Sequence, residues 1–387
     1  ASVMRPARVD ARGWGWRHAS RLAWAVSDLT FTIEPGERVL LLGASGAGKS
    51  TLIQAIAGVL GGADDGESVG ELRVDGVPPA AGRAGLVLQD PDSQVILARV
   101  GDDVAFGCEN LGVPRDETWL RVGEALDAVG LDLPLDHPTS ALSGGQKQRL
   151  ALAGVLAMQP GLLLLDEPTA NLDAAGVAEV RESVARVVDA TGSTLIVIEH
   201  RVAVWRDLVD RVIVLSAGGG VLADGSPAAV LGREGAALAA SGIWGPGFAP
   251  TVATRQRREM TRMLHTEQLA IARVPGTTVA SDITLEVGDG RALAITGPNG
   301  SGKSTLALTL GGLLAPAAGL VVADTLAEGV DRSPVRWKSR ELLTRIGTVF
   351  QDPEHQFVAA TVRDELAVGP RVLRMPAAEI EARVEQL

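Results

Sequence analysis

The chain contains one segment twice, and this duplication limits its possible folds more than any other feature. "SDLTFTIEPGERVLLLGASGAGKSTL" from Ser27 aligns without gaps with "SDITLEVGDGRALAITGPNGSGKSTL" from Ser281, 254 residues later. A second pair, "LVLQDPDSQVILARVGDDVAFG" from Leu86 and "TVFQDPEHQFVAATVRDELAVG" from Thr348, lies 262 residues apart. At 387 residues the chain is long enough for two domains with separate cores. We therefore expect two related domains.

Each copy contains the pattern G-x-x-x-x-G-K-S between an apolar run and a helical segment. Glycines let backbone N–H groups approach phosphate oxygens, a helix N-terminus adds positive potential, and the lysine adds a full charge. The serine hydroxyl can ligate Mg²⁺. A chance glycine-rich turn does not account for two copies in the same context. The predicted nucleotide contacts are Gly43, Ala44, Ser45, Gly46, Ala47, Gly48, Lys49, Ser50 and Thr51, and in the second copy Gly297, Pro298, Asn299, Gly300, Ser301, Gly302, Lys303, Ser304 and Thr305.

Four short apolar runs of the first copy each end in polar residues. The runs "RVLLLG", "GLVLQ", "LLLLDE" and "TLIVIEH" end at Gly43, at Gln89, at Asp166 and Glu167, and at Glu199 and His200. Runs that are apolar on both faces are typical of central parallel strands covered by helices, although any single run could also be part of a buried helix. Because ligands bind beyond the carboxyl ends of such strands, we expect these polar side chains to lie together.

The polar residues at these strand ends fit the needs of phosphoryl transfer, which are positioning, charge neutralisation and a group that orients the attacking water. We assign Asp166 to the Mg²⁺ shell, Glu167 to the base that polarises water, and His200 to holding that water or the γ-phosphate. Gln89 would contact metal and nucleotide. A structural role is the alternative for His200, but its place beside the other polar residues favours the reaction. The predicted metal ligands are Ser50, Gln89 and Asp166, and in the second copy Ser304 and Gln351.

The segment "LSGGQKQRLALAGVLAMQP" predicts a second helix start suited to an anion. Ser143 is a good N-cap, and Gly144 and Gly145 leave backbone amides accessible. A plain helix cap is the alternative. Since the same copy already has a phosphate loop, we expect Ser143, Gly144, Gly145 and Gln146 to serve a nucleotide that another domain holds.

Taken together, "GASGAGKST", "LVLQDP", "LSGGQKQR", "LLLLDEPTANLD" and "IVIEH" resemble the motifs of the ATP-binding cassette (ABC) superfamily, including its Walker A loop. The resemblance covers almost the whole chain. It implies an α/β fold of the P-loop NTPase class, with a mainly parallel central sheet and helices, an antiparallel β subdomain and a helical signature subdomain, here duplicated. It also implies an ATPase with ATP and Mg²⁺ as cofactors. In that family two cassettes close head to tail, and ATP lies between the phosphate loop of one and the "LSGGQ" of the other.

Two more positions acquire roles from the resemblance alone. Trp16, in "GWGWRH", resembles the aromatic residue that stacks on adenine, with the alternative that it is an apolar strand residue like Trp14. The segment from Asn171 to Asp173 resembles the loop that joins the two sites. The second copy has Arg273 in "AIARVPG" and no aromatic residue there, so adenine stacking is not expected in its site.

The repeated "QDP" segments narrow the resemblance to the ATPases of energy-coupling factor (ECF) transporters, which import vitamins and transition-metal ions. This branch implies a peripheral protein on the cytoplasmic face of the cell membrane. Its partners would be a membrane-embedded coupling (T) protein and a substrate-binding (S) protein. We expect a complete first cassette at residues 1–247, a linker at 248–264, and the N-terminal part of a second cassette at 265–387.

The second copy has a phosphate loop and Gln351 but no signature, metal-binding aspartate, catalytic glutamate or histidine. Neither composite site is complete within these residues. We therefore expect that the sequence is a fragment, that a cassette–cassette dimer forms within the intact chain, and that apolar strands of the second copy lack partners.

Composition excludes several other classes. A net charge of −11 argues against a nucleic-acid partner, and no apolar run is long enough to cross a bilayer. The single cysteine, Cys108, fits a reducing compartment. The alternative function is a soluble tandem-cassette ATPase acting on nucleic acid or ribosomes, but the short linker and the absence of a long heptad stretch or Cys cluster disfavour it. A catalytically inactive regulatory cassette is disfavoured by Glu167 and His200. The resemblance implies that a separate membrane protein selects the transported substrate, and the tandem arrangement is similar to that of thiamine-precursor systems.

Overall fold

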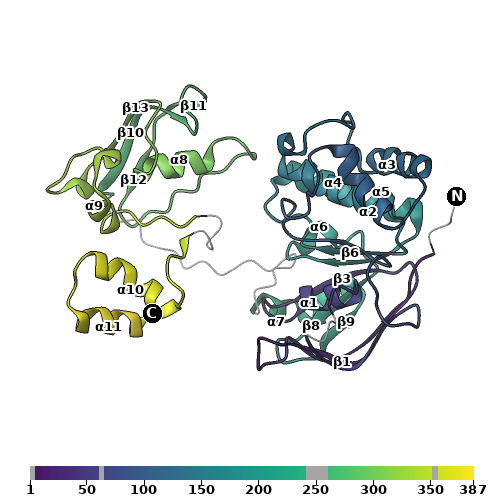
Figure 1. The fold of residues 1–387 in the computed structure, drawn as a ribbon. Helices are drawn as coiled ribbons and strands as arrows, with labels where there is room; N and C mark the ends of the chain where they lie inside the picture. Colours follow the sequence, from purple (N-terminus) through teal and green to yellow (C-terminus); the bar gives the residue numbers. More distant parts are fainter. Residues whose placement is uncertain (1–4, 61–64, 241–259, 351–355) are drawn as a thin grey trace. The chain divides into compact units, whose positions relative to one another are not determined.

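The computed structural model describes residues 5–60, 65–240, 260–350 and 356–387 (Figure 1). The chain divides into two compact units, Ala1–Val252 and Ala253–Leu387, and each has its own fold. Residues 248–259 of the expected linker lie outside the described residues.

A six-stranded sheet forms the centre of the first unit (Figure 1). Its strands lie in the order β5 (Gly85–Val87), β6 (Leu162–Asp166), β7 (Thr194–Ile198), β3 (Arg38–Gly43), β8 (Arg211–Leu215) and β9 (Val221–Gly225). The first five are parallel and β9 is antiparallel to β8. The prediction of parallel strands from the four apolar runs is confirmed, with β6, β7 and β3 central and β5 at the edge of the sheet. The alternative of buried helix segments is excluded.

Successive residues of the central strands pack against two different cores. In β3, Leu40 and Leu42 belong to the core that also contains residues of α2 to α5. Val39 and Leu41 belong to the core on the other face of the sheet, which contains residues of α1. All four are at most 2 % exposed. Because a strand turns alternate side chains to opposite faces, burial on both faces requires the nearly continuous apolar runs that the sequence has.

Helices cover the sheet of the first unit. The helices are α1 (Lys49–Ile56), α2 (Val100–Asn110), α3 (Arg115–Val129), α4 (Gly144–Ala157), α5 (Ala174–Thr191), α6 (Val202–Trp205) and α7 (Pro227–Ala240), with a 3₁₀ turn at η1 (Thr139–Ala141). Apolar residues of α2, α3, α4 and α5 share one core, whereas those of α1 lie in the other. The single cysteine, Cys108 in α2, is buried, and its Sγ donates to the Ala157 carbonyl oxygen at 3.1 Å.

A three-stranded antiparallel sheet completes the first unit. Its order is β2 (Val26–Ile33), β1 (Val9–His18) and β4 (Gly66–Val74). Trp14 and Trp16 of β1 lie in the same core as α1. This sheet therefore holds the β1–β2 loop next to the start of α1, where the phosphate loop ends.

The second unit repeats the antiparallel sheet. Strand β10 (Arg262–Ala272) pairs antiparallel with β11 (Thr278–Ile283), β12 (Glu286–Gly288) and β13 (Ala318–Ala323). The helices are α8 (Lys303–Leu310), α9 (Ser339–Leu343), α10 (Val362–Val372) and α11 (Ala377–Gln386), with 3₁₀ turns at η2 (Thr325–Ala327) and η3 (Pro334–Arg336). Its core is small and consists of five buried residues and the partly buried residues around them.

The strand expected before the second phosphate loop is not formed. Residues 292–297, the counterparts of β3, have no regular structure, and Leu293 is 50 % exposed. Residues 347–349, the counterparts of β5, also form no strand, and Val349 is 90 % exposed. In the first unit these strands pair with β6, β7 and β8, to which no residues of 265–387 align. An apolar strand without a ladder partner leaves its backbone groups unpaired, so these segments stay irregular here.

Candidate active site

The phosphate loop of the first unit follows β3 and ends at α1. Gly46 and Gly48 have φ angles of 82° and 83°, in the left-handed region that glycine adopts at little cost. A Cβ on Gly48 would lie 2.2 Å from Val26 Cγ2 and 2.4 Å from the Ala25 carbonyl oxygen. The loop therefore needs glycine at position 48 both for its turn and for close packing on the β1–β2 segment.

Lys49 lies inside this loop and is only 7 % exposed. Its Nζ donates to the carbonyl oxygens of Gly43 at 2.8 Å and Ala44 at 3.2 Å. Burial lowers the pKa of Lys49, and the charges of Glu167 and Asp166 oppose that change. A buried ammonium group with only carbonyl partners is well suited to an anionic ligand.

The carboxylates after β6 lie against the phosphate loop and the neighbouring strand ends. Gln89 Nε2 donates to Glu167 Oε2 at 3.0 Å, and His200 Nε2 lies 2.9 Å from Glu167 Oε1. Glu167 has a φ of 46°, an unusual conformation for a residue with a side chain. The structure thus brings together the predicted base, the histidine and the glutamine.

Asp166 makes a different contact, with the phosphate-loop serine. Its carboxylate is 5 % exposed. Burial raises the pKa of Asp166, while a hydrogen bond from Ser50 and the charge of Lys49 lower it. The hydroxyl of Ser50 and this carboxylate supply hard oxygen donors of the kind that Mg²⁺ prefers, and a buried anion gains from a cation beside it. These residues fit a divalent cation.

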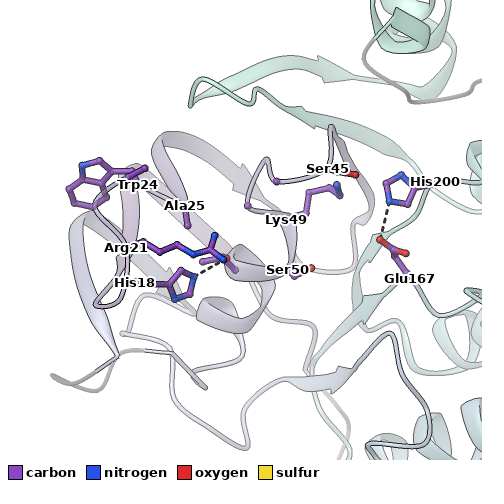
Figure 2. A pocket seen from close by; sticks show the side chains of 13 residues that line it. His18, Arg21, Trp24, Ala25, Ser45, Lys49, Ser50, Glu167 and His200 are labelled. Carbon is purple, nitrogen blue, oxygen red and sulfur yellow. Dashed lines mark hydrogen bonds and ion pairs between the residues drawn. The ribbon is translucent and has the colours of Figure 1, made fainter. Parts of the chain in front are cut away.

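A cavity of about 400 Å³ opens over the phosphate loop (Figure 2). It contains eight residues that the sequence predicts for the site and five that it does not. The predicted ones are Ser45, Gly46, Gly48, Lys49, Ser50, Thr51, Glu167 and His200, and the others are His18, Arg21, Ala23, Trp24 and Ala25. In Figure 2 the Glu167–His200 pair lies on one side of the loop, and His18, Arg21 and Trp24 lie on the other.

Trp16 does not lie in this cavity, contrary to the expectation that it stacks on adenine. Its side chain is buried, with 4 % exposure, in the core below β1. The pairings Val9↔Val74 and Leu264↔Ala323 show that Val9 of β1 is equivalent to Leu264 of β10. The residue of the second copy equivalent to Trp16 is therefore Ile271. Ile271 is also buried, at 1 % exposure. Both copies therefore use this position for the core, as the alternative interpretation held.

His18 and Trp24 line the cavity in which the sequence analysis expected Trp16. His18 Nε2 lies 3.4 Å from Thr51 Oγ1, at the start of α1. Trp24 is 40 % exposed, and the Arg17 guanidinium lies 5.8 Å from its ring centroid. The β1–β10 alignment puts Arg273 at the position of His18. The register comparison argues against Trp16, whose counterpart Ile271 is buried, and the cavity lining identifies His18.

The signature residues, Ser143, Gly144, Gly145 and Gln146, lie at the start of α4 and do not line the cavity. Ser143 Oγ accepts from the Gln146 backbone N–H at 3.3 Å, and Gln146 Oε1 accepts from the Ser143 N–H at 2.8 Å. This capping box fixes the first turn. Ser143 and Gly144 are nevertheless exposed, so the helix start can still meet an external anion.

The loop after Gln89 is closed by the second glutamine of the repeated motif. Gln94 Oε1 accepts from the Leu88 N–H at 3.0 Å, and its Nε2 donates to the Leu88 carbonyl oxygen at 3.1 Å. Asp103 Oδ1 accepts from the N–H groups of Ile96 and Leu97 at 2.8 and 2.7 Å. These side chains explain why the motif extends beyond its first glutamine.

The loop from Asn171 to Asp173 leads into α5. Asn171 has a φ of 60°, and Asp173 Oδ1 accepts from the Gly176 N–H at 2.9 Å as the N-cap of that helix. Its expected role in joining two sites remains a prediction.

In the second unit, Lys303 Nζ donates to the carbonyl oxygens of Gly297 at 2.9 Å and Pro298 at 2.7 Å. Gly300 and Gly302 have φ angles of 80° and 90°. The loop geometry of the first unit is thus repeated. Gln351, the predicted glutamine of this site, lies outside the described residues.

No helix among residues 5–60, 65–240, 260–350 and 356–387 is both long and apolar enough to cross a bilayer.

Comparison with known families and curated proteins gives one consistent result. The model of the family described as ABC transporter matches residues 26–170 and 280–387. "Putative HMP/thiamine import ATP-binding protein YkoD" of Bacillus subtilis strain 168 is 33 % identical over 93 % of this chain and 70 % of its own length. "Putative ABC transporter ATP-binding protein BL0043" of Bifidobacterium longum is 35 % identical over 94 % of this chain and 51 % of its own length. The chain thus spans only part of each relative.

Two solved structures share the fold. CbiO1 of Clostridium perfringens, described as part of the ABC transporter complex CbiONQ, matches with a TM-score of 0.51 and 34 % identity, over 58 % of this chain and 91 % of its own. A bacterial Atm1-family ABC exporter with ATP bound matches with a TM-score of 0.51 and 28 % identity, over 64 % of this chain and 44 % of its own.

Proposed function

The chain belongs to the ABC transporter family of ATP-binding ATPases, and from this premise we propose that it powers import by an ECF-type transporter. The observation that carries the proposal is the cluster in which the Glu167 carboxylate lies between Gln89 and His200 at the edge of the phosphate-loop cavity. The repeated "QDP" segments and the similarity to YkoD and CbiO1 support the import branch.

ATP would lie along the cavity of the first unit. Its phosphates would contact the loop N–H groups and Lys49, and its base would lie near His18 and Trp24. The Arg21 backbone N–H donates to the His18 carbonyl oxygen at 2.9 Å, but its guanidinium has no hydrogen bond or ion pair with any residue in the part of the chain that the structure describes. The guanidinium points toward the start of α1 (Figure 2). A planar cation so placed fits a phosphate or ribose oxygen.

The hydrolytic step would use Glu167 as general base. A carboxylate held from both sides has one orientation, which lets it polarise a water aimed at the γ-phosphate. Ser50 and Asp166 would hold Mg²⁺, with Gln89 reaching it through its amide oxygen. Bound there, Mg²⁺ neutralises charge on the β- and γ-phosphate oxygens.

The signature residues would act on a nucleotide bound by another cassette. Their exposure at the start of α4 and their absence from the lining of the first cavity support this assignment. Cassette closure on ATP would then be transmitted to a membrane-embedded coupling protein and a separate substrate-binding protein. We place the protein at the cytoplasmic face of the membrane, with the domain boundaries 1–247, 248–264 and 265–387.

Co-purification and turnover test this function together. The full-length protein, expressed with its neighbouring reading frames, is expected to co-purify with small hydrophobic membrane proteins and to hydrolyse ATP. Uptake of labelled thiamine precursors is the first transport to assay, because a relative's name contains that substrate class. Stable association with ribosomes or DNA in place of membrane proteins would overturn the proposal.

A further inference from the structure

Glu199, the buried residue that directly follows β7, has no role in the function proposed so far. Its side chain is 4 % exposed. Within the described part of the chain no lysine, arginine or histidine side chain forms an ion pair with it. A buried carboxylate is unfavourable unless its oxygens accept hydrogen bonds, so its partners indicate why it is there.

The two carboxylate oxygens of Glu199 serve two different loops. Oε1 accepts from the Thr169 N–H at 3.1 Å and also from the Thr169 hydroxyl group. Oε2 accepts from the His200 N–H at 3.2 Å, with the Arg201 N–H at 3.5 Å beside it. Thr169 is fully buried, with 0 % exposure. One side chain therefore joins the loop after β6 to the loop after β7.

These two loops carry the reacting pair. Thr169 lies two residues after Glu167, and Glu199 directly precedes His200. The Glu167 N–H also donates to the Ile198 carbonyl oxygen at 3.0 Å. The Glu167–His200 contact of 2.9 Å is thus framed by bonds between the same two loops. A side chain that fixes the separation of two loops also fixes how the groups on them face each other.

We propose that Glu199 is a positioning residue for ATP hydrolysis, which holds His200 against Glu167 by bridging Thr169 to the His200 backbone. The proposal rests on the function proposed above, because it assigns Glu199 to the same reaction. It makes no claim of contact between Glu199 and the nucleotide. Its effect is expected on turnover and not on nucleotide affinity.

Substitutions of Thr169 test the bridge with little change in volume. Thr169→Val removes the hydroxyl donor, and Thr169→Ser retains it. Glu199→Gln leaves one acceptor oxygen in place of two, so its side chain cannot accept from both Thr169 and the His200 N–H. Thr118→Val is the matched control. Thr118 is 2 % exposed in α3, and its hydroxyl donates to the Val113 carbonyl oxygen at 3.3 Å, outside the site.

ATP turnover, ATP affinity and melting temperature are measured on the full-length protein. Thr169→Val is expected to lower kcat about tenfold, the equivalent of one hydrogen bond to a charged group. Its ATP affinity should stay within about twofold of the parent value, since it makes no contact with the nucleotide. Thr169→Ser should retain most of the activity, and Thr118→Val should retain kcat.

A double-mutant cycle with His200→Ala separates positioning from general weakening of the fold. If Glu199 acts through His200, Thr169→Val should slow the His200→Ala variant much less than it slows the parent protein. An equal reduction in both backgrounds, or a fall in melting temperature with no change in kcat, would overturn the proposal. An inactive parent protein would instead count against the proposed function itself, so the two failures are distinguishable.

Discussion

The two phosphate loops have the same geometry in very different surroundings. Lys49 and Lys303 each donate to two carbonyl oxygens of their own loop, at distances of 2.7 to 3.2 Å. The glycines Gly46 and Gly300 have φ angles of 82° and 80°. However, a buried parallel strand precedes the first loop, whereas an exposed irregular segment precedes the second. The loop conformation is therefore encoded within about eight residues, and the strand depends on partners distant in the sequence.

The loops that follow the glutamine motif give the same lesson. In the first unit Asp103 Oδ1 accepts from the N–H groups of Ile96 and Leu97. In the second unit Glu365 Oε2 accepts from Val358 and Ala359, at 2.9 and 2.8 Å. One carboxylate caps two amides in both copies, although the side chains differ by a methylene group. Features built from short-range hydrogen bonds recur, as does the antiparallel sheet, whereas the parallel strands do not.

The largest effect should be on hydrolysis at the first unit, where the proposed base Glu167 lies between Gln89 and His200 at the strand ends. Glu167→Gln is expected to lower turnover of the full-length protein by a factor of about 10² to 10⁴, since it removes the proposed general base. ATP binding should persist, because the phosphate loop is unchanged. Steady-state hydrolysis and equilibrium nucleotide binding, measured on the same preparation, test this. Undiminished turnover would mean that another group is the base.

The next effect compares the two lysines. Lys49→Ala is expected to weaken ATP binding by roughly 30-fold, about 2 kcal/mol, because it removes a buried charge from the phosphate site. Lys303→Ala is the matched control in a loop with the same internal hydrogen bonds. If the surroundings of the loop contribute to affinity, Lys303→Ala should have the smaller effect. Titration calorimetry with a non-hydrolysable ATP analogue measures both, and equal losses would remove the distinction between the units.

A smaller effect is expected where the base of ATP would lie. His18→Ala should weaken ATP binding by about fivefold, close to 1 kcal/mol, through loss of ring contact. Arg21→Ala should weaken it by a similar factor through loss of a cation.

Trp16→Ile, which introduces the residue of the second copy, is the control for this test. It should lower the melting temperature and leave ATP affinity nearly unchanged, because the Trp16 side chain is in the core. A large loss of affinity in Trp16→Ile would restore the original assignment of that residue.

The smallest effects should come from the capping carboxylates. Asp103→Asn and Glu365→Gln each replace a charged acceptor with a neutral one and should destabilise their loops by about 0.5 to 1 kcal/mol. Amide hydrogen exchange at positions 96, 97, 358 and 359 reports each loop separately. Similar increases in exchange at both sites are expected, because the hydrogen bonds are equivalent. A change in only one unit would show that the longer glutamate side chain makes a different contribution.

Much of this molecule follows from sequence because its motifs are local. Apolar runs with polar ends predict β3, β5, β6 and β7, and the glycine patterns predict both phosphate loops. The Trp16 assignment fails for a physical reason. Trp14, Trp16 and His18 lie at every second position of one strand, and residue type alone does not show which of them reaches the cavity. The phosphate-loop motif alone does not show that the strand before Gly297 is absent, but the missing partner strands of the second copy predict it, since pairing depends on residues elsewhere in the chain.

Glu199 shows another limit of sequence reasoning. Its position at a strand end is visible in the sequence, but its bridge to Thr169 joins residues 30 apart and depends on the turn at Glu167. No spacing rule relates those two residues. Contacts of this kind come from the three-dimensional fold.

Each phosphate loop forms hydrogen bonds between its own lysine and its own carbonyl oxygens, so one loop can replace the other. A segment that holds its own shape can be moved between scaffolds without redesign of its neighbours. Replacement of Gly43–Ser50 in the first unit by the sequence of Gly297–Ser304 should therefore give a phosphate loop that still binds ATP. Duplicated genes can diverge around such a segment while the segment itself keeps its chemistry.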